Sequence, residues 1–167
     1  MRLSSTMLVS AVACAVIGIA ASAPRTPLLV WNATASAPLG LYFRTTSSAL
    51  NKGDLVLVHT PTRIAALAAE RGYLPMHVPL IKRAAAISGD VICAKGDTVW
   101  LNGRVLLRRR AADSKGRTLP QWSGCSRLGS SDVFLAMANV RDSFDGRYFG
   151  PISTSNIVGH LVPLWTH

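Results

Sequence analysis

The chain has 167 residues, of which 49% are apolar, so it is long and hydrophobic enough for one domain with its own core and an N-terminal extension. Its 18 lysines and arginines outnumber 8 acidic residues, and the net charge of +10 would suit a nucleic acid or an anionic membrane surface as a partner. The basic residues are scattered, apart from Arg108–Arg110, and few aromatic residues lie among them. The sequence therefore argues against a nucleic-acid partner, because it offers no surface on which bases could stack.

The first predicted element is an apolar segment from Leu3 to Ala23 that contains no charged residue. A helix needs about 20 such residues to cross a bilayer, so the segment predicts a transmembrane anchor. Its small-residue end, Ala21-Ser22-Ala23, also fits a cleavable secretory signal. Both interpretations put the rest of the chain outside the cytoplasm. We favour a retained anchor over residues 1–25, followed by an exported domain over residues 26–167.

Beyond the anchor, the sequence predicts mainly β-structure. A short strand is expected over Asp54–Thr60, and the apolar spacing of Arg63–Tyr73 predicts a helix with Gly72 as its C-cap. Asn102-Gly103, between two apolar stretches, gives the strongest hairpin signal of the chain. Two further buried strands are expected over residues 131–139 and 157–165. Residues 108–129 are polar and rich in turn residues, so we expect a loop there.

Three cysteines bear on the compartment and on metal binding. Cys14 lies inside the apolar segment and is interpreted as a small packing residue. Cys93 and Cys125 fall in the exported part, where they could pair in an oxidising compartment or remain two separate buried thiols. No histidine joins them at the spacing of zinc ligands, so we expect no metal site.

A candidate catalytic base is Lys82, which lies in the segment VPLIKRAAAI with apolar residues on both sides. A hydroxyl nucleophile needs a base within hydrogen-bonding reach, and no triad motif flanks any of the four histidines, His59, His77, His160 and His167. Burial lowers the pKa of a lysine because it disfavours the charged form, so a buried Lys82 could take a proton. In a strand, Arg83 would then face solvent. The alternative is a surface lysine that only solubilises the edge of a sheet.

Four segments of the chain resemble the sequence boxes of type I signal peptidases. TASAPLGLY resembles the serine box, LIKRAAAISGDVI the lysine box, VWLNGRVL the strand-turn-strand that follows it, and DSFDGRYFGPI the late S-x-D-x-R-Y-x-G box. The four occur in the family's order and span Ser36 to Ile152, which is nearly all of the exported chain.

The serine box narrows the resemblance. Housekeeping signal peptidases carry S-M-x-P, whereas here the proline comes one place closer, in Ser36-Ala37-Pro38. The form SAPLGLY and the segment AERGYLPMHVPLIKR resemble conjugal-transfer peptidases of the TraF type. This resemblance implies a mainly β fold, a small coiled sheet or half-barrel with one short helix and a loop excursion, preceded by a transmembrane helix.

The same resemblance implies an activity and a location. The enzyme would be a serine endopeptidase, anchored in the inner membrane with its catalytic domain in the periplasm, that processes a conjugative pilin precursor. In some members of this type the cut pilin is also joined head to tail. No cofactor, metal or nucleic acid is implied.

Roles for individual residues follow from the resemblance and are consistent with the chemistry. Ser36 would attack the scissile carbonyl, and neutral Lys82 would take its proton and pass it to the leaving amine. The backbone N–H of Ser36 and the hydroxyl of Thr34 would be the two donors of an oxyanion hole, although Thr34 could also be an ordinary turn hydroxyl.

The late box supplies the supporting residues. Ser143 lies where the family has a hydroxyl that orients the lysine. Asp145 and Arg147 match the acid and the base of the box, and could form an ion pair that braces the loop. Asp145 could instead take part directly in the reaction, and Asp142 is interpreted as a turn cap.

The position of Ser36 fits cleavage next to a membrane. It lies 13 residues after Ala23, and such a tether reaches at most ~43–47 Å when extended. Candidates for the apolar substrate pocket are Leu39, Leu41 and Ile81. The alternatives are a general signal peptidase, a relative of self-cleaving repressors, which the exported N-terminus argues against, and a non-catalytic exported domain of the same fold.

Overall fold

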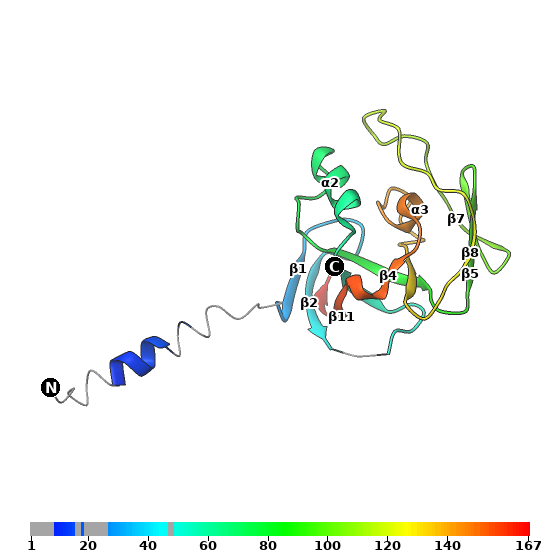
Figure 1. Ribbon diagram of the computed structural model, residues 1–167. Helices are drawn as coiled ribbons and strands as arrows, with labels where there is room; N and C mark the ends of the chain where they lie inside the picture. Colours follow the sequence, from blue (N-terminus) through cyan, green and yellow to red (C-terminus); the bar gives the residue numbers. More distant parts are fainter. Residues whose placement is uncertain (1–8, 16–17, 19–26, 47–48) are drawn as a thin grey trace.

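A computed structural model describes residues 9–15, 18, 27–46 and 49–167 of the chain. Within these ranges the protein is mainly β, with strands paired antiparallel in two sheets and only short helices (Figure 1). The mainly β fold predicted from the sequence is confirmed.

The larger sheet has seven strands in the order β1-β2-β11-β3-β4-β9-β10. In chain order they are β1 (Leu29–Asn32), β2 (Gly40–Thr45), β3 (Leu55–Val58), β4 (Leu80–Ala86), β9 (Asp132–Leu135), β10 (Ile152–Ser153) and β11 (Ile157–Thr166). The smaller sheet has four strands in the order β7-β6-β5-β8. They are β5 (Val91–Lys95), β6 (Thr98–Leu101), β7 (Arg104–Arg108) and β8 (Gly124–Arg127). The helices among the described residues that have defined bounds are α2 (Thr62–Glu70), α3 (Gly146–Phe149) and the 3₁₀ helix η1 (Thr154–Asn156).

The centre of the larger sheet is apolar on both faces. All four residues of β3 are buried, and they alternate between two core clusters, Leu55 and Leu57 in one and Val56 and Val58 in the other. This alternation follows from the two-residue period of a strand. A third cluster links β4 to the smaller sheet and includes Ile92, Val99 and Phe134, which are fully buried.

Helix α2 is shorter than the sequence predicts. It ends at Glu70 instead of Tyr73, because Gly72 adopts the left-handed conformation with φ 69°. The N–H of Gly72 bonds to the carbonyl of Ala69 (3.0 Å), and the N–H of Tyr73 bonds back to the carbonyl of Ala68 (2.8 Å). This pair of bonds is a Schellman ending, so Gly72 ends the helix as predicted although the helix stops earlier.

The predicted hairpin is present between β6 and β7. Asn102 and Gly103 both have positive φ, 50° and 79°, as a two-residue hairpin turn of type I′ requires. By contrast, residues 124–127 of the predicted loop form strand β8, which pairs with β5. All four residues of β8 are exposed, so the strand shows no apolar alternation by which it could have been predicted.

The predicted anchor lies mostly outside the described residues. Residues 9–15 and Gly18 are helical, and the predicted boundary at residues 25–26 falls among the residues not described. In the part of the chain that the structure describes, no helix has the length and apolar character needed to cross a bilayer. Cys14, expected as a packing residue, is exposed and has a free thiol.

Candidate active site

Ser36 lies in the tight connection between β1 and β2, the first two strands of the larger sheet. Strand pairing brings the two ends of this connection together, with Asn32 opposite Gly40. Gly40 has φ 140°, and a Cβ on it would lie 2.0 Å from the carbonyl oxygen of Trp165. Only glycine fits there, so the glycine of the SAPLGLY motif lets β11 approach the serine turn closely.

The side chain of Asn32 holds the serine turn together. It is 4% exposed, and its amide nitrogen lies within hydrogen-bonding distance of three carbonyl oxygens of the turn, those of Thr34 (3.0 Å), Ala37 (2.9 Å) and Pro38 (3.0 Å). Sequence reasoning did not identify this residue. The available signal was an asparagine at the start of a turn, where its side chain commonly bonds to the backbone just after it.

Thr34 and Ser36 lie side by side in this turn. Thr34 Oγ1 is 3.3 Å from Ser36 Oγ and donates to Asn32 Oδ1 at 2.8 Å. Thr34 is exposed and Ser36 is half-buried, so both hydroxyls remain accessible.

Lys82 is buried in the middle of the larger sheet. It lies on β4 opposite Val56 of β3 and is 1% exposed, whereas the next residue, Arg83, is exposed, as predicted. Burial lowers the pKa of Lys82 to about 8, since a buried ammonium loses its hydration. The carboxylate of Asp145 acts in the opposite direction, and the guanidinium of Arg147 adds to the lowering.

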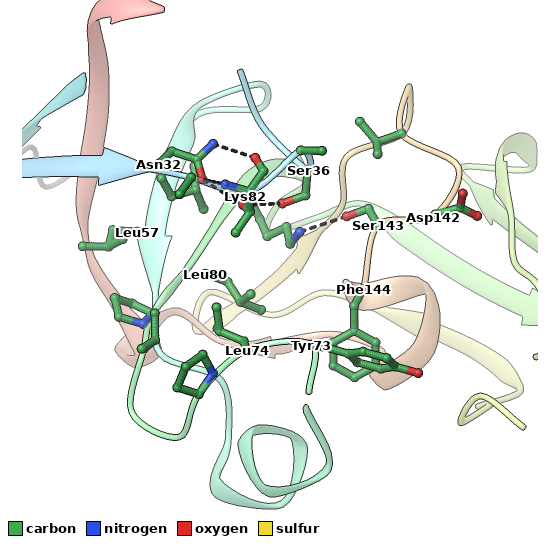
Figure 2. Close-up of a pocket in the computed structure, with 18 of the residues that line it drawn as sticks. Asn32, Ser36, Leu57, Tyr73, Leu74, Leu80, Lys82, Asp142, Ser143 and Phe144 are labelled. Atoms are coloured by element: carbon green, nitrogen blue, oxygen red, sulfur yellow. Dashed lines mark hydrogen bonds between the residues drawn. The ribbon is translucent and has the colours of Figure 1, made fainter. Parts of the chain in front are cut away.

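Ser143 is the hydrogen-bond partner of Lys82. It lies in the loop between β9 and α3 and is 2% exposed, and Lys82 Nζ donates to Ser143 Oγ at 2.9 Å (Figure 2). The two residues are 61 positions apart in the sequence. Ser143 thus holds the end of the lysine side chain in place.

Asp145 and Arg147 form a buried ion pair, one of the two alternatives that the sequence left open. Their side chains are 0% and 1% exposed, and Arg147 Nε lies 2.8 Å from Asp145 Oδ1. Asp145 also accepts from the backbone N–H groups of Arg147 (3.1 Å) and Met137 (3.0 Å), while Arg147 donates to the carbonyls of Met137 and Arg141, both at 2.8 Å. These bonds close the loop that carries Ser143. Neither charged residue lines the cleft described next.

Ser36, Lys82 and Ser143 open onto one cleft of about 860 Å³ (Figure 2). Most of its wall is apolar and comes from β1, β3, β4 and the segment before β4, with Val30, Leu57, Leu74, Val78, Leu80 and Ile81 among the lining side chains. Of the three residues expected to form the substrate pocket, Ile81 lines the cleft and Leu39 and Leu41 do not. Within this cleft Ser36 Oγ bonds to Thr34, and Lys82 Nζ bonds to Ser143, so the described hydrogen bonds include none between Ser36 and Lys82.

Residues 2–165 match the family described as signal peptidase, peptidase S26. The chain belongs to the S26 signal peptidase family. Membership implies hydrolysis of peptide bonds by a serine peptidase.

Three curated relatives place this peptidase more closely within the family. It is 37% identical to the plasmid transfer protein TraF of Escherichia coli over 146 residues, which is 81% of each chain. It is 32% identical to the conjugal transfer protein TraF of Agrobacterium fabrum over 145 residues, again 81% of each chain. Signal peptidase I V of Bacillus subtilis is 34% identical over 95 residues, 51% of this chain and 56% of that protein.

Among solved structures, a signal peptidase I of Enterococcus faecalis aligns with 71% of this peptidase and with 100% of its own chain. The sequence identity is 19% and the TM-score is 0.39.

The outer wall of the cleft contains charged pairs that sequence reasoning missed. Asp142, interpreted as a turn cap, instead pairs with Arg110 at 2.7 Å, and both line the cleft. Tyr73 donates to Asp113 at 2.5 Å, and Arg117 pairs with the same carboxylate at 2.7 Å. The bond from Tyr73 joins the turn after α2 to the loop between β7 and β8, whereas the pair of Arg117 with Asp113 lies within that loop. The Tyr73 bond and the pair of Arg110 with Asp142 connect residues 40 and 32 positions apart, which residue spacing alone could not indicate.

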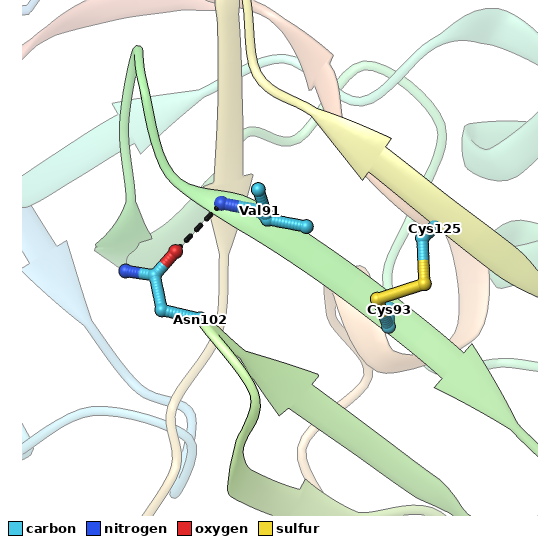
Figure 3. Close-up of a disulfide and its surroundings, with 4 residues drawn as sticks. All are labelled: Val91, Cys93, Asn102 and Cys125. Atoms are coloured by element: carbon cyan, nitrogen blue, oxygen red, sulfur yellow. Dashed lines mark hydrogen bonds between the residues drawn. A yellow bond between two sulfur atoms is a disulfide. The ribbon is translucent and has the colours of Figure 1, made fainter.

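Cys93 and Cys125 lie in the smaller sheet (Figure 3), and neither is among the residues that line the cleft. They are directly opposite each other on β5 and β8, and their sulfur atoms are joined at 2.05 Å. The structure thus adopts the paired alternative for these two cysteines. Among the described residues, histidine, cysteine, aspartate and glutamate side chains nowhere gather in a group of three or more that could hold a metal ion.

Proposed function

We propose that this signal peptidase is a membrane-anchored serine endopeptidase with a Ser-Lys dyad that processes a conjugative pilin precursor. One observation carries the dyad: a lysine with its pKa lowered to about 8 opens onto the same cleft as a turn serine. A general base works best when its pKa lies near the working pH, and an ordinary lysine at 10.5 is far from it.

The proposed reaction begins with attack of Ser36 Oγ on the scissile carbonyl. Lys82 Nζ takes the serine proton and then gives it to the leaving amine, so the first step ends with an ester between Ser36 and the substrate and a free amine product. The bond from Lys82 to Ser143 supports this role, because a neutral amine that donates one N–H still has its lone pair available for a proton.

The second step decides between two products. Attack by water on the ester releases a linear pilin and frees Ser36. Attack by the pilin's own amino group would release a head-to-tail ring instead, with a new peptide bond in place of the ester. The apolar wall of the cleft would favour the ring if it keeps water away from the ester.

The substrate class rests on the relatives. The Escherichia coli and Agrobacterium relatives are called plasmid transfer and conjugal transfer proteins, and each aligns with 81% of this chain. Pilin precursors are membrane-bound proteins cut next to the bilayer, which agrees with a serine placed shortly after an N-terminal apolar segment.

Location at the periplasmic face of the inner membrane is part of the proposal. It is supported by a row of exposed apolar side chains across β1, β2 and β11, in which Leu29, Phe43 and Val162 are directly opposite one another. Beside this row, Trp31 and Trp165 are 58% and 60% exposed, and their rings are 6.0 Å apart. Tryptophan is favoured where an apolar surface meets lipid headgroups.

The test uses the full-length protein in detergent with its pilin precursor. The wild type should release a processed pilin, and Ser36→Ala and Lys82→Arg should both abolish processing, because alanine lacks the nucleophile and arginine keeps its proton. Ser126→Ala and Lys95→Arg are matched controls, since both residues are exposed on the smaller sheet. Turnover by folded Ser36→Ala would refute the assignment.

Mass spectrometry of the same product separates the two outcomes of the second step. A ring weighs one water less than the linear product of the same cut. A general signal peptidase would cut unrelated secretory precursors at a comparable rate, and a non-catalytic domain would cut neither.

A further inference from the structure

The amide of Asn32 is fully engaged in the serine turn. Its nitrogen faces the carbonyl oxygens of Thr34, Ala37 and Pro38, and its oxygen accepts from the backbone N–H of Thr34 at 3.0 Å and from the Thr34 hydroxyl at 2.8 Å. The orientation of this amide is fixed by chemistry. Exchanging its two ends would put an acceptor oxygen against three acceptor carbonyls and a donor nitrogen against a donor N–H.

This orientation determines the direction of the neighbouring hydroxyl bonds. Asn32 Oδ1 carries no hydrogen, so the single hydrogen of the Thr34 hydroxyl points to Asn32. In the contact of 3.3 Å between Thr34 Oγ1 and Ser36 Oγ, Thr34 can then only accept and Ser36 donates. The Ser36 proton therefore points to Thr34, and it must turn toward Lys82 for the reaction to begin.

We infer that Asn32 is a positioning residue for the nucleophile, and that Asn32 and Thr34 act on Ser36 as one unit. Asn32 holds the turn through its nitrogen and fixes the Thr34 oxygen beside Ser36 through its oxygen. The Thr34 hydroxyl carries one hydrogen, so Thr34 can donate to an oxyanion only by turning that hydrogen away from Asn32, while the backbone N–H of Thr34 keeps its bond to Asn32 Oδ1. Thr34 can stabilise an oxyanion only from the position that Asn32 gives it. This inference rests on the proposed peptidase function.

A double-mutant cycle tests whether the two residues act together. The kcat and KM of the full-length enzyme are measured on the pilin precursor for the wild type, Asn32→Ala, Thr34→Val and the double variant. Each single change should lower kcat about 100-fold while KM changes little, since small displacements of a nucleophile have effects of this size. The double variant should be no worse than Asn32→Ala within about threefold, because both changes break the same contact.

Independent roles would give a different result. If the two losses multiply to about 10⁴-fold, Thr34 acts without Asn32 and the inference is wrong. Asn51→Ala is the matched control, because Asn51 is an exposed asparagine in the turn before β3, and it should keep wild-type kcat.

Thr34→Ser and Thr34→Val keep the inference falsifiable even if Asn32→Ala does not fold. Serine keeps the hydroxyl that bonds to Asn32 and should restore kcat to within about fivefold of the wild type, whereas valine keeps only the shape. Wild-type kcat in Thr34→Val would overturn the inference. A wild-type enzyme that does not cut the precursor would instead overturn the proposed function, so the two failures can be told apart.

Discussion

Lys82 and Ser143, 61 positions apart in the sequence, meet in the cleft, with Lys82 Nζ donating to Ser143 Oγ at 2.9 Å. Lys82 comes from strand β4 and Ser143 from the loop between β9 and α3, and both are almost completely buried. A lysine side chain is long and flexible, so a buried partner at its tip restricts the positions of the amine. The loop that carries Ser143 is in turn closed by the ion pair between Asp145 and Arg147.

Ser143→Ala should therefore lower kcat about 10–100-fold and change KM little, because the amine loses its fixed position but the substrate wall stays intact. The bond also favours the charged amine, so its loss should move the pKa of Lys82 below the present value of about 8. The pH dependence of kcat/KM measures this displacement, and Ser143→Thr should restore both quantities in part. An unchanged kcat and an unchanged pH dependence would show that Ser143 does not position the lysine.

Asp145→Asn should reduce the free energy of unfolding by about 3–5 kcal/mol, because it leaves the Arg147 guanidinium buried without a charged partner. Urea unfolding monitored by tryptophan fluorescence measures the loss. Asp142→Asn is the control, since Asp142 is 70% exposed in its pair with Arg110 and should keep close to wild-type stability. If Asp145→Asn keeps wild-type stability but has no turnover, Asp145 takes part in the reaction directly.

The sequence predicts the local elements of this fold better than the contacts between them. Four apolar residues in a row indicate β3, and Asn102-Gly103 indicates the hairpin between β6 and β7, because these signals are local. Strand β8 has no such signal, because its residues are all exposed and it is held by pairing with β5.

In the candidate site, too, the sequence indicates local features better than contacts between distant residues. The apolar neighbours of Lys82 indicate a buried amine, but they cannot identify a partner 61 residues away. Ser143 was assigned through the family resemblance and not through physical reasoning. Asn32 and the pair of Arg110 with Asp142 follow from how the turn and the loops fold, and no spacing in the sequence indicates them.

Replacing Cys93 and Cys125 with serine should lower the free energy of unfolding by about 3–4 kcal/mol, because their bond closes a loop of about 32 residues and restricts the unfolded chain. The cysteines lie outside the cleft, so kcat at moderate temperature should stay close to the wild-type value. Denaturant unfolding and a thiol count under denaturing, non-reducing conditions are the measurements. One free thiol, from Cys14, is expected in the wild type, and three free thiols would show that the pair does not form.

The pH dependence of turnover should follow Lys82. Burial lowers the pKa of its amine to about 8, so kcat/KM should rise about tenfold per pH unit below that value and level off above it. The measurement is a pH–rate profile on the detergent-solubilised enzyme with a pilin-derived peptide. The profile is repeated in single alanine variants of the four histidines, His59, His77, His160 and His167. If the rise of kcat/KM with pH is lost in one of these variants, that histidine is the base.

The stability of the protein should also depend on Lys82, with a sign fixed by its two pKa values. The pKa is about 8 when folded and 10.5 when unfolded, so between these values the unfolded chain binds more protons and stability rises with pH. The difference corresponds to about 3 kcal/mol, a cost that is complete below pH 8 and absent above 10.5.

Lys82→Met removes the titrating amine and keeps a long apolar side chain in the same place. The variant should therefore be more stable than the wild type at pH 7, by at most about 3 kcal/mol because the bond to Ser143 is lost, and this advantage should shrink as the pH rises toward 10.5. Urea unfolding of both proteins at pH 7, 8, 9 and 10 gives the difference directly. A difference that stays constant over this range would mean that Lys82 has an ordinary pKa when folded, and the Ser-Lys assignment would lose its physical basis.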